Sequence, residues 1–159
     1  MFLNKTYYAT ISCSPSNLRE LAVGHLLSAG VIRSIQEIDA INLGKTACNV
    51  RLKSDIDLRE RLALFRPSYR IMTSASGQPT PHKRNARLSK NKSDLKVKAE
   101  TISASVTRLD SIAEVFRKTG GVHVAAVYKA DGSLVAFAED VGRHNAVDKV
   151  IGMAALGKA

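Results

Sequence analysis

Aromatic residues are scarce in this 159-residue sequence: tryptophan is absent, and the aromatic share is 5%. Proteins that bind single-stranded nucleic acid by base stacking need aromatic side chains among basic ones, so this composition argues against that function. No apolar run reaches the length of about 18 residues that a membrane-spanning helix needs. The first residues also lack a basic and apolar leader with a cleavage site, and we therefore expect a cytoplasmic protein with no membrane association.

Cysteine is nearly absent as well, since Cys13 and Cys48 are the only two in the sequence. Two thiols separated by 34 residues form neither a metal motif nor a disulfide framework. Zinc deaminases need a His/Cys-x-Glu element and a Pro-Cys-x-x-Cys pair, and the sequence contains neither: valine and alanine follow His123. We therefore predict no metal site, and a reducing compartment is the default.

Acidic residues are outnumbered by basic ones, 14 to 24, which leaves a formal net charge of +10. The excess is concentrated in residues 82–98, where seven lysines and arginines face one aspartate, for a local charge of +6. Such a segment attracts polyanions. It is also typical of a solvated linker, so linker, nucleotide-binding and acidic-protein-binding roles all stay open, with nucleic acid disfavoured by the scarcity of aromatics.

The first third of the chain has the pattern of a compact α/β unit. β-Branched and aromatic residues over 7–13 predict a strand, and apolar residues at helical spacing over 14–32 predict a helix. We expect Ser14 or Ser16 to cap the start of this helix and Gly30 to end it.

Further along, alternating apolar and polar residues predict two strands over 38–44 and 47–53, followed by a helix over 54–66. Serines and prolines over 71–85 then predict a loop, which leads into the basic segment. We place a domain boundary here. The expected units are an N-terminal α/β subdomain over 1–72, a linker over 73–100 and a second unit over 101–159.

The last part of the chain has the clearest pattern. Apolar residues on one face predict a helix over 107–121, including Leu109, Ile112, Val115 and Phe116. Two apolar runs joined at Asp131-Gly132 predict a β-hairpin over 122–141. A final helix is predicted by apolar positions that recur at helical spacing, namely Val147, Val150, Ile151, Ala154 and Ala155.

Polar residues crowd the turn between the hairpin and the last helix, in the stretch EDVGRHNAVDK over 139–149. Part of this polarity has a structural explanation. Gly142 permits backbone shapes closed to other residues, and Asn145 can cap the helix with Asp148 as its capping-box partner. On this interpretation the turn is a capped corner that satisfies its own polar groups.

The same turn is also suited to binding an anion. Arg143 and His144 lie just before the expected helix start, where free N–H groups and the helix dipole favour negative charge. The arginine adds donors that match phosphate oxygens. Asp140 could accept from a sugar hydroxyl, a base amino group or Arg143. A phosphate or nucleotide site and a self-satisfied corner therefore both stay open.

Two histidines have competing interpretations. His25 lies among apolar positions of the predicted helix, which favours a partly buried structural role over a ligand role. His123 follows two glycines at the start of the hairpin, and glycine permits the close approach of a ligand or of another backbone. Judged alone, His123 fits a structural role slightly better than a binding role.

Two stretches together resemble the FdhD family, the formate dehydrogenase accessory sulfurtransferases. They are TGGVHVAAVYKADGSLVAFAEDVGRHNAVDKVIGMA (119–154) and SPSNLRELAVGHLLSAGVIRSIQEI (14–38). The resemblance implies an α/β fold, with a small N-terminal α/β domain beside a cytidine-deaminase-like α/β domain. It also implies a protein that receives sulfur from a cysteine desulfurase as a persulfide on a Cys-X-X-Cys loop and passes it to the molybdenum bis-guanine dinucleotide cofactor of formate dehydrogenase.

The family resemblance further implies that a guanine nucleotide such as GDP binds in place of half of that cofactor. It suggests which residues line the pocket, namely His123, Asp140, Gly142, Arg143, His144 and Asn145. Pyrophosphates on the cofactor would also account for the positive charge of the chain.

Two features depart from the family pattern. Ser76 and Pro79 occupy the two positions of the persulfide cysteines, and a serine hydroxyl cannot carry sulfane sulfur. We therefore expect no catalytic residue there and impaired sulfur transfer; the alternatives are a non-catalytic module that binds the cofactor or a guanine nucleotide and, less favoured, a nucleic-acid-binding protein. Family members also continue beyond the last helix, so we expect either self-association or a fragment of a longer protein.

Overall fold

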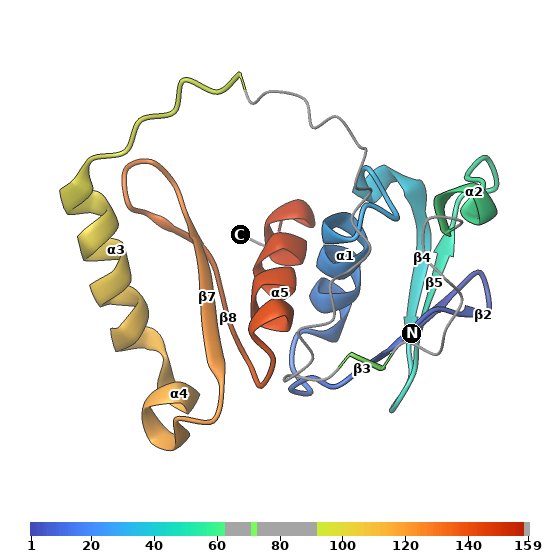
Figure 1. The fold of residues 1–159 in the computed structure, drawn as a ribbon, viewed down its shortest axis with the longest axis horizontal. Helices are drawn as coiled ribbons and strands as arrows, with labels where there is room; N and C mark the ends of the chain where they lie inside the picture. The colour runs from blue at the N-terminus through green and yellow to red at the C-terminus, as the bar shows by residue number, and fades with distance from the viewer. Residues whose placement is uncertain (63–70, 73–91, 158–159) are drawn as a thin grey trace.

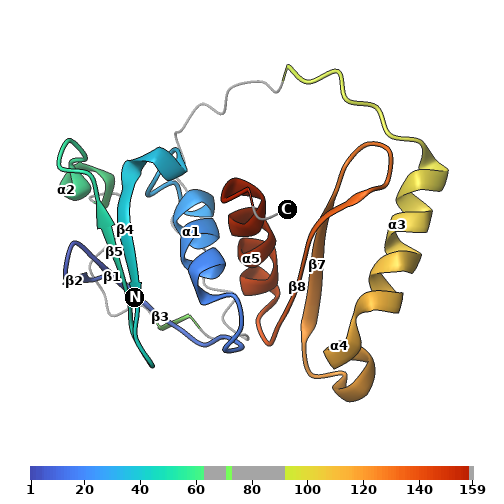
Figure 2. The ribbon, with the colours of Figure 1, turned by 180° about the vertical axis from the view of Figure 1, so that it is seen from behind.

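The computed structural model describes residues 1–62, 71–72 and 92–157, and these form a mixed α/β structure, as expected. Helices α1 (Leu18–Ser28) and α5 (Arg143–Ala155) lie side by side at the centre (Figure 1). A four-stranded sheet covers the outer side of α1, and a β-hairpin covers the outer side of α5. Figure 2 shows the same order of layers from behind. No helix in the described ranges is long and apolar enough to cross a membrane.

The N-terminal sheet has the strand order β2-β1-β5-β4. Its strands are β1 (Phe2–Leu3), β2 (Thr6–Tyr7), β4 (Ile38–Leu43) and β5 (Cys48–Leu52). β1 is parallel to β5, and the other neighbours are antiparallel. The predicted strands over 38–44 and 47–53 are thereby confirmed. A short 3-10 helix (Ile35–Glu37) precedes β4, and α2 (Leu58–Leu62) follows β5.

The strand predicted over 7–13 is wrong, because this stretch is divided between two sheets. β2 ends at Tyr7, and β3 (Thr10–Ile11) pairs in parallel with β6 (Ile71–Met72). The sequence pattern also missed β1. Asn4 and Lys5 adopt left-handed backbone angles, with φ of 49° and 67°, and so reverse the chain between β1 and β2.

Helix α1 ends as predicted but does not begin as predicted. Gly30 has φ of 70°, and its amide donates to the Leu27 carbonyl while the Val31 amide donates to the Leu26 carbonyl, each at 2.9 Å. This is the pattern by which glycine ends a helix. At the other end Asn17 is the N-cap and makes no side-chain cap bond. Ser14 and Ser16 therefore do not cap α1.

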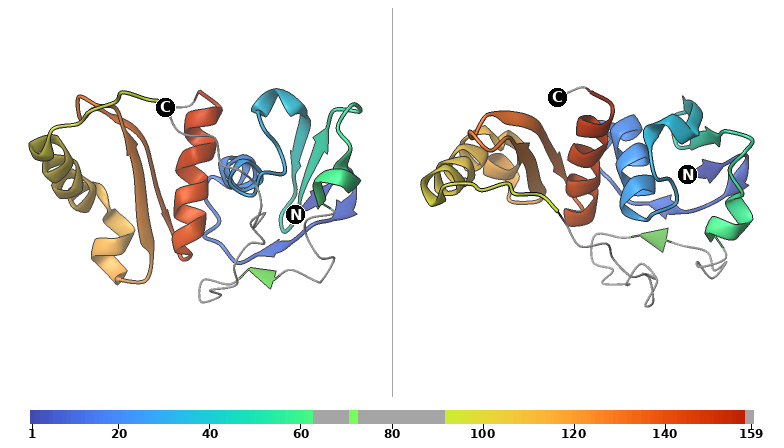
Figure 3. Two further views of the ribbon diagram at one scale, coloured as in Figure 1. Left: turned by 45° about the horizontal axis from the view of Figure 1, so that its top comes forward. Right: turned by 90° about the horizontal axis from the view of Figure 1, so that it is seen from above.

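Helices α1 and α5 approach each other closely through two glycines. A Cβ atom on Gly24 would lie 1.7 Å from the carbonyl oxygen of Asp148, and one on Gly152 would lie 1.9 Å from the carbonyl oxygen of Glu20. Both distances are far shorter than any real contact, so only glycine fits at these positions. Figure 3 shows α1 end-on beside a side view of α5, with the two helices crossing.

The helix predicted over 107–121 is two helices, α3 (Ala99–Ile112) and α4 (Glu114–Thr119). The break falls at the buried Ala113, and the Glu139 carboxylate accepts hydrogen bonds from the first amides of α4, Val115 N at 3.2 Å and Phe116 N at 2.8 Å. The side chains of both of these residues are exposed, so the predicted common apolar face is wrong.

The hairpin is confirmed as β7 (His123–Tyr128) and β8 (Leu134–Asp140), with Gly132 at φ of 84° in its turn. The helix predicted after it is also confirmed, but its buried face differs from the prediction. Val147 and Ala154 are exposed, whereas Asp148, Lys149 and Gly152 are buried. The reason is that α5 lies between two layers, so a face with polar and small residues is covered by α1.

Candidate functional site

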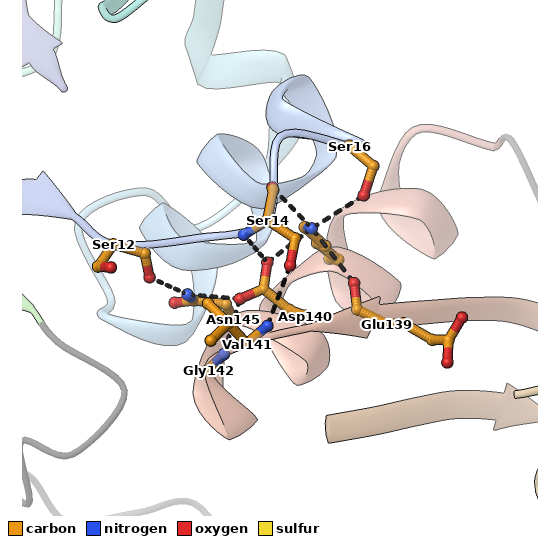
Figure 4. Close-up of polar contacts among 9 residues, drawn as sticks. Ser12, Ser14, Ser16, Glu139, Asp140, Val141, Gly142 and Asn145 are labelled. Atoms are coloured by element: carbon orange, nitrogen blue, oxygen red, sulfur yellow. Dashed lines mark hydrogen bonds and ion pairs between the residues drawn. The ribbon is translucent and has the colours of Figure 1, made fainter. Parts of the chain in front are cut away.

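The turn between β8 and α5 lies against the chain segment that precedes α1. We call residues 140–145 the corner and residues 12–16 the serine segment. Figure 4 shows that Asp140 and Asn145 point toward the backbone of the serine segment. The two segments are separated by more than 120 positions in the sequence, and the packing of α1 on α5 brings them together.

Asp140 is the centre of this arrangement and has no exposed surface. One carboxylate oxygen, Oδ1, accepts from the Gly142 amide at 2.8 Å and from Asn145 Nδ2 at 2.9 Å. The other, Oδ2, accepts from the Ser14 amide at 3.0 Å and forms an ion pair with Lys149 Nζ at 2.6 Å. Four donors thus surround the carboxylate, which satisfies a charge that would otherwise be costly to bury.

Lys149 is fully buried beside Asp140. Its ammonium group also lies within hydrogen-bond reach of three further oxygens, the Ser14 carbonyl at 3.2 Å, Ser16 Oγ at 3.3 Å and the Glu139 carbonyl at 3.4 Å. An ammonium has three N–H donors, so the Asp140 carboxylate and these three oxygens together offer it more acceptors than it can use at once. Lys149 thus joins α5 to both the serine segment and β8.

Asn145 does not cap α5, and the predicted capping box with Asp148 is wrong. The N-cap is Gly142, with no side-chain cap bond. Asn145 lies inside the first turn and donates from Nδ2 to the Ser12 carbonyl at 2.8 Å as well as to Asp140. Gly142 has an ordinary φ of −107°, but a Cβ atom there would lie 2.7 Å from Asn145 Nδ2. Its small size, rather than an unusual backbone shape, makes room for this side chain.

Ser14 completes the corner network, our name for the contacts among the serine segment, the corner and Lys149. Its hydroxyl accepts a hydrogen bond from the Val141 amide at 3.1 Å, and its amide donates to Asp140. The serines expected to cap a helix thus bind a distant turn. Much of the corner is self-satisfied, which is one of the two interpretations that the sequence left open.

Arg143 and His144 are the exception. They are the first two residues of α5, and both are exposed. Within the described ranges, neither side chain has a hydrogen-bond or ion-pair partner. The amides of a first helical turn have no partner inside the helix, and the helix dipole adds partial positive charge at the same place. This end of α5 therefore presents N–H donors to a ligand, whereas the carboxylate of Asp140 is buried and does not accept from them.

His123 lies at the end of the hairpin that is next to the corner. In the hairpin it is the register partner of Asp140, the last residue of β8. It is exposed and, in the part of the chain that the structure describes, makes no side-chain contact of a polar kind. The structure therefore brings His123 to the same end of the hairpin as the corner. His25 is the structural histidine that we expected, 7% exposed and 3.0 Å from Asp148 through Nδ1.

Cys13 and Cys48 are the two cysteines of the chain, and they do not form a Cys-X-X-Cys pair. Both thiols are half-buried and free. Burial, the largest cause, and the nearby Asp140 raise the pKa of the Cys13 thiol, and burial also raises the pKa of the Cys48 thiol. A raised pKa lowers the thiolate fraction that sulfur chemistry requires. Ser76 and Pro79 lie outside the described residues, as do 82–91 of the basic segment.

No cluster of three or more metal-ligating side chains occurs in the ranges that the structure describes. Lys149, Ser12 and Ser14 were not predicted as members of the corner network. One signal for Lys149 was available: it shares a helical face with the apolar Ala146, Val150 and Met153. A lysine at such a position needs a buried partner, and Asp140 provides it.

The chain as a whole matches a known protein family. The family model described as FdhD/NarQ matches residues 1–159, and the chain belongs to the FdhD/NarQ family. A protein named sulfur carrier protein FdhD from Saccharolobus solfataricus is 36% identical over 146 residues, covering 91% of this chain and 54% of that protein. One of the same name from Mycolicibacterium paratuberculosis is 36% identical over 155 residues, covering 89% and 56%.

A solved structure has a similar fold. It is the crystal structure of a Desulfotalea psychrophila protein whose name assigns it, provisionally, as a formate dehydrogenase accessory protein. The TM-score is 0.72 at 24% identity, and the match covers 99% of this chain and 58% of the other. The chain thus spans little more than half the length of the relatives that it matches.

Proposed function

We propose that this chain serves formate dehydrogenase as an accessory protein and binds a guanine nucleotide, or the guanine-dinucleotide part of a molybdenum cofactor, at the corner. The name of the solved structure supports the accessory role, whereas the curated relatives are named sulfur carrier proteins. The observation that carries the binding role is the exposed pair Arg143 and His144 on the first turn of a 13-residue helix, whose side chains have no polar partner among the described residues.

The donors at this place fit the phosphates of such a ligand. The Arg143 guanidinium can donate two parallel hydrogen bonds to a phosphate, and the amides of the first turn can donate to a second oxygen. His144 and His123 add imidazole groups at the same end. When bound, the cofactor would supply the molybdenum centre, while the residues of this chain hold and orient its phosphates.

We infer that this chain binds the cofactor without the persulfide step that the family resemblance implies. Ser76 and Pro79 carry no thiol, and the two cysteines elsewhere have raised pKa values caused mainly by burial. A non-catalytic binding module therefore agrees better with the residues than a sulfurtransferase. Formate dehydrogenase and a cysteine desulfurase remain proposed partners, although Ser76 and Pro79 offer the desulfurase no thiol to load.

Calorimetric titration with GDP tests the proposal. We expect wild type to bind and Arg143→Ala to weaken binding by about tenfold or more, because a hydrogen bond to a charged group contributes about 1.5–3 kcal/mol. Arg108→Ala is the matched control, since Arg108 is also exposed, lies on α3 and leaves the same net charge when replaced. Equal affinities of wild type and Arg143→Ala would remove the corner as the site.

A further inference from the structure

We propose that the buried Asp140–Lys149 pair is a positioning device, which holds the first turn of α5 so that Arg143 and His144 face an anionic ligand while neither member of the pair contacts it. The expected effect of this pair on ligand affinity rests on the proposed function. The expected effect on the order of the backbone at the corner does not depend on any ligand.

Asp140 cannot offer its carboxylate to a ligand in this arrangement. Both oxygens already accept from two donors each, at 2.6 to 3.0 Å, and the residue has no exposed surface. Asn145 is committed through its donors, because the two N–H groups of Nδ2 donate to Asp140 and to the Ser12 carbonyl. These two residues therefore act through the backbone that they hold.

Stability alone does not account for the pair. Removing two charges from water costs several kcal/mol per ion, and a buried ion pair can often be replaced by apolar residues without loss of stability. Apolar residues, however, lack directed contacts. Lys149 makes such contacts with Ser14, Ser16 and Glu139, and it thereby sets α5 in one position relative to two other segments.

The contacts lie on both sides of the two exposed residues. Before Arg143, the amides of Val141 and Gly142 donate to Ser14 Oγ and Asp140 Oδ1. After His144, Asn145 donates to Asp140 and to the serine segment. The backbone that carries the two free side chains is therefore held at each end, and its amides point in a fixed direction.

Amide hydrogen exchange of the protein, without ligand, tests the backbone consequence. We expect Lys149→Met to accelerate exchange at Ser14, Val141 and Gly142 by about tenfold or more, while Leu26 and Val50 in the N-terminal core stay protected. Lys118→Met is the matched control, because its side chain is 74% exposed and the charge change is equal. Acceleration of equal size everywhere, or none at the corner, would overturn the proposal.

Two further variants cover the case in which Lys149→Met does not fold. Asp140→Asn combined with Lys149→Met removes both charges, so no unpaired ion stays buried. Ser14→Ala removes only the acceptor of the Val141 amide. Each is expected to accelerate exchange at the corner, with a smaller effect for Ser14→Ala. Amide exchange at the corner that is as slow as in wild type in both variants would count against the proposal.

A double-mutant cycle with GDP tests the ligand consequence. We expect Lys149→Met to weaken GDP binding by about tenfold in wild type and by less than twofold in the Arg143→Ala background, because Lys149 would act through the placement of Arg143. Additive losses would mean that Lys149 acts independently and would overturn the positioning role. If wild type does not bind GDP, the proposed function fails, and hydrogen exchange still decides whether the pair positions the turn.

Discussion

Nδ1 of His25 on α1 lies 3.0 Å from a carboxylate oxygen of Asp148 on α5, and the side chains are only 9% and 10% exposed. On the far side of the ring, Nε2 lies 3.4 Å from the hydroxyl of Tyr8. Next to this pair the two helices touch through Gly24 and Gly152. A polar contact and a backbone contact thus share one interface, which joins the two halves of the chain.

Replacing Gly24 or Gly152 by alanine should destabilise the protein strongly. The new methyl group would meet backbone atoms of the opposite helix at 1.7 Å or 1.9 Å, so the helices must separate. Overpacking of this kind costs about 1–3 kcal/mol and more where the backbone cannot move. Chemical denaturation of each variant measures the loss in the free energy of unfolding.

Gly121→Ala is the control for this prediction. Gly121 has no positive φ, and the nearest atom to its Cβ would be a side-chain atom of Thr119 at 3.5 Å, an ordinary contact. We expect a change of less than about 0.5 kcal/mol there. If Gly24→Ala were as stable as Gly121→Ala, the close crossing of α1 and α5 would be wrong.

His25→Ala should lower the free energy of unfolding by about 2–3 kcal/mol, because Asp148 would stay buried without this partner. The exposed His144→Ala serves as control and should have little effect on stability. A double-mutant cycle of His25→Ala with Asp148→Ala separates the energy of this contact from the other effects of each substitution on stability. Additive effects of His25→Ala and Asp148→Ala would show that the two side chains do not interact.

Glu37 on the 3-10 helix accepts a hydrogen bond from Arg61 Nη2 at 2.9 Å, and this bond is the largest cause of a lowered pKa of the Glu37 carboxyl. A folded-state pKa below the unfolded value of about 4.3 means that the bond stabilises the protein above that pH and is lost as pH falls through the lowered pKa. Glu37→Gln should therefore cost about 1 kcal/mol at neutral pH and almost nothing in strong acid.

The control for the pH prediction is Glu114→Gln. Glu114 pairs with Lys118 at 3.6 Å, but its side chain is 77% exposed, so its replacement should change stability little at any pH. Urea denaturation across the acidic range gives both curves. A loss for Glu37→Gln that persists unchanged at low pH would exclude the ion pair as its origin.

Incubation with a cysteine desulfurase and cysteine should leave wild type without persulfide. The raised pKa values of the Cys13 and Cys48 thiols, due mainly to burial, favour the protonated and unreactive form. Ser76→Cys with Pro79→Cys should gain the mass of one sulfur atom, measured on the intact protein. A wild-type protein that is persulfidated as readily as this variant would refute the proposal of binding without sulfur transfer.

Local signals in the sequence predicted a large part of the fold. The hairpin around Asp131-Gly132, the strands β4 and β5 and the end of α1 at Gly30 are all where the sequence pattern indicated. Each depends on residues close in the chain: a turn residue, an alternation or a glycine that can adopt positive φ. The motifs at 14–38 and 119–154 also identified the family correctly.

Predictions about which side chain serves which end of a helix were less successful. Ser14 precedes α1 and Asn145 lies in the first turn of α5, so the sequence around each resembles that of a cap. In the structure both bind across the junction between the two helices, because Asp140 and the serine segment lie there as competing partners. A cap residue is chosen by all the partners within reach, and most of these are distant in the sequence.

The sequence by itself determined the helices and strands with strong local patterns, the family and the absence of thiols at positions 76 and 79. Only the tertiary structure decided that Lys149 is buried against Asp140, that Gly24 touches the opposite helix and that Arg143 and His144 are exposed. The reason is that burial and pairing depend on which surfaces meet. Here they join residues more than 100 positions apart, beyond the range of any local pattern.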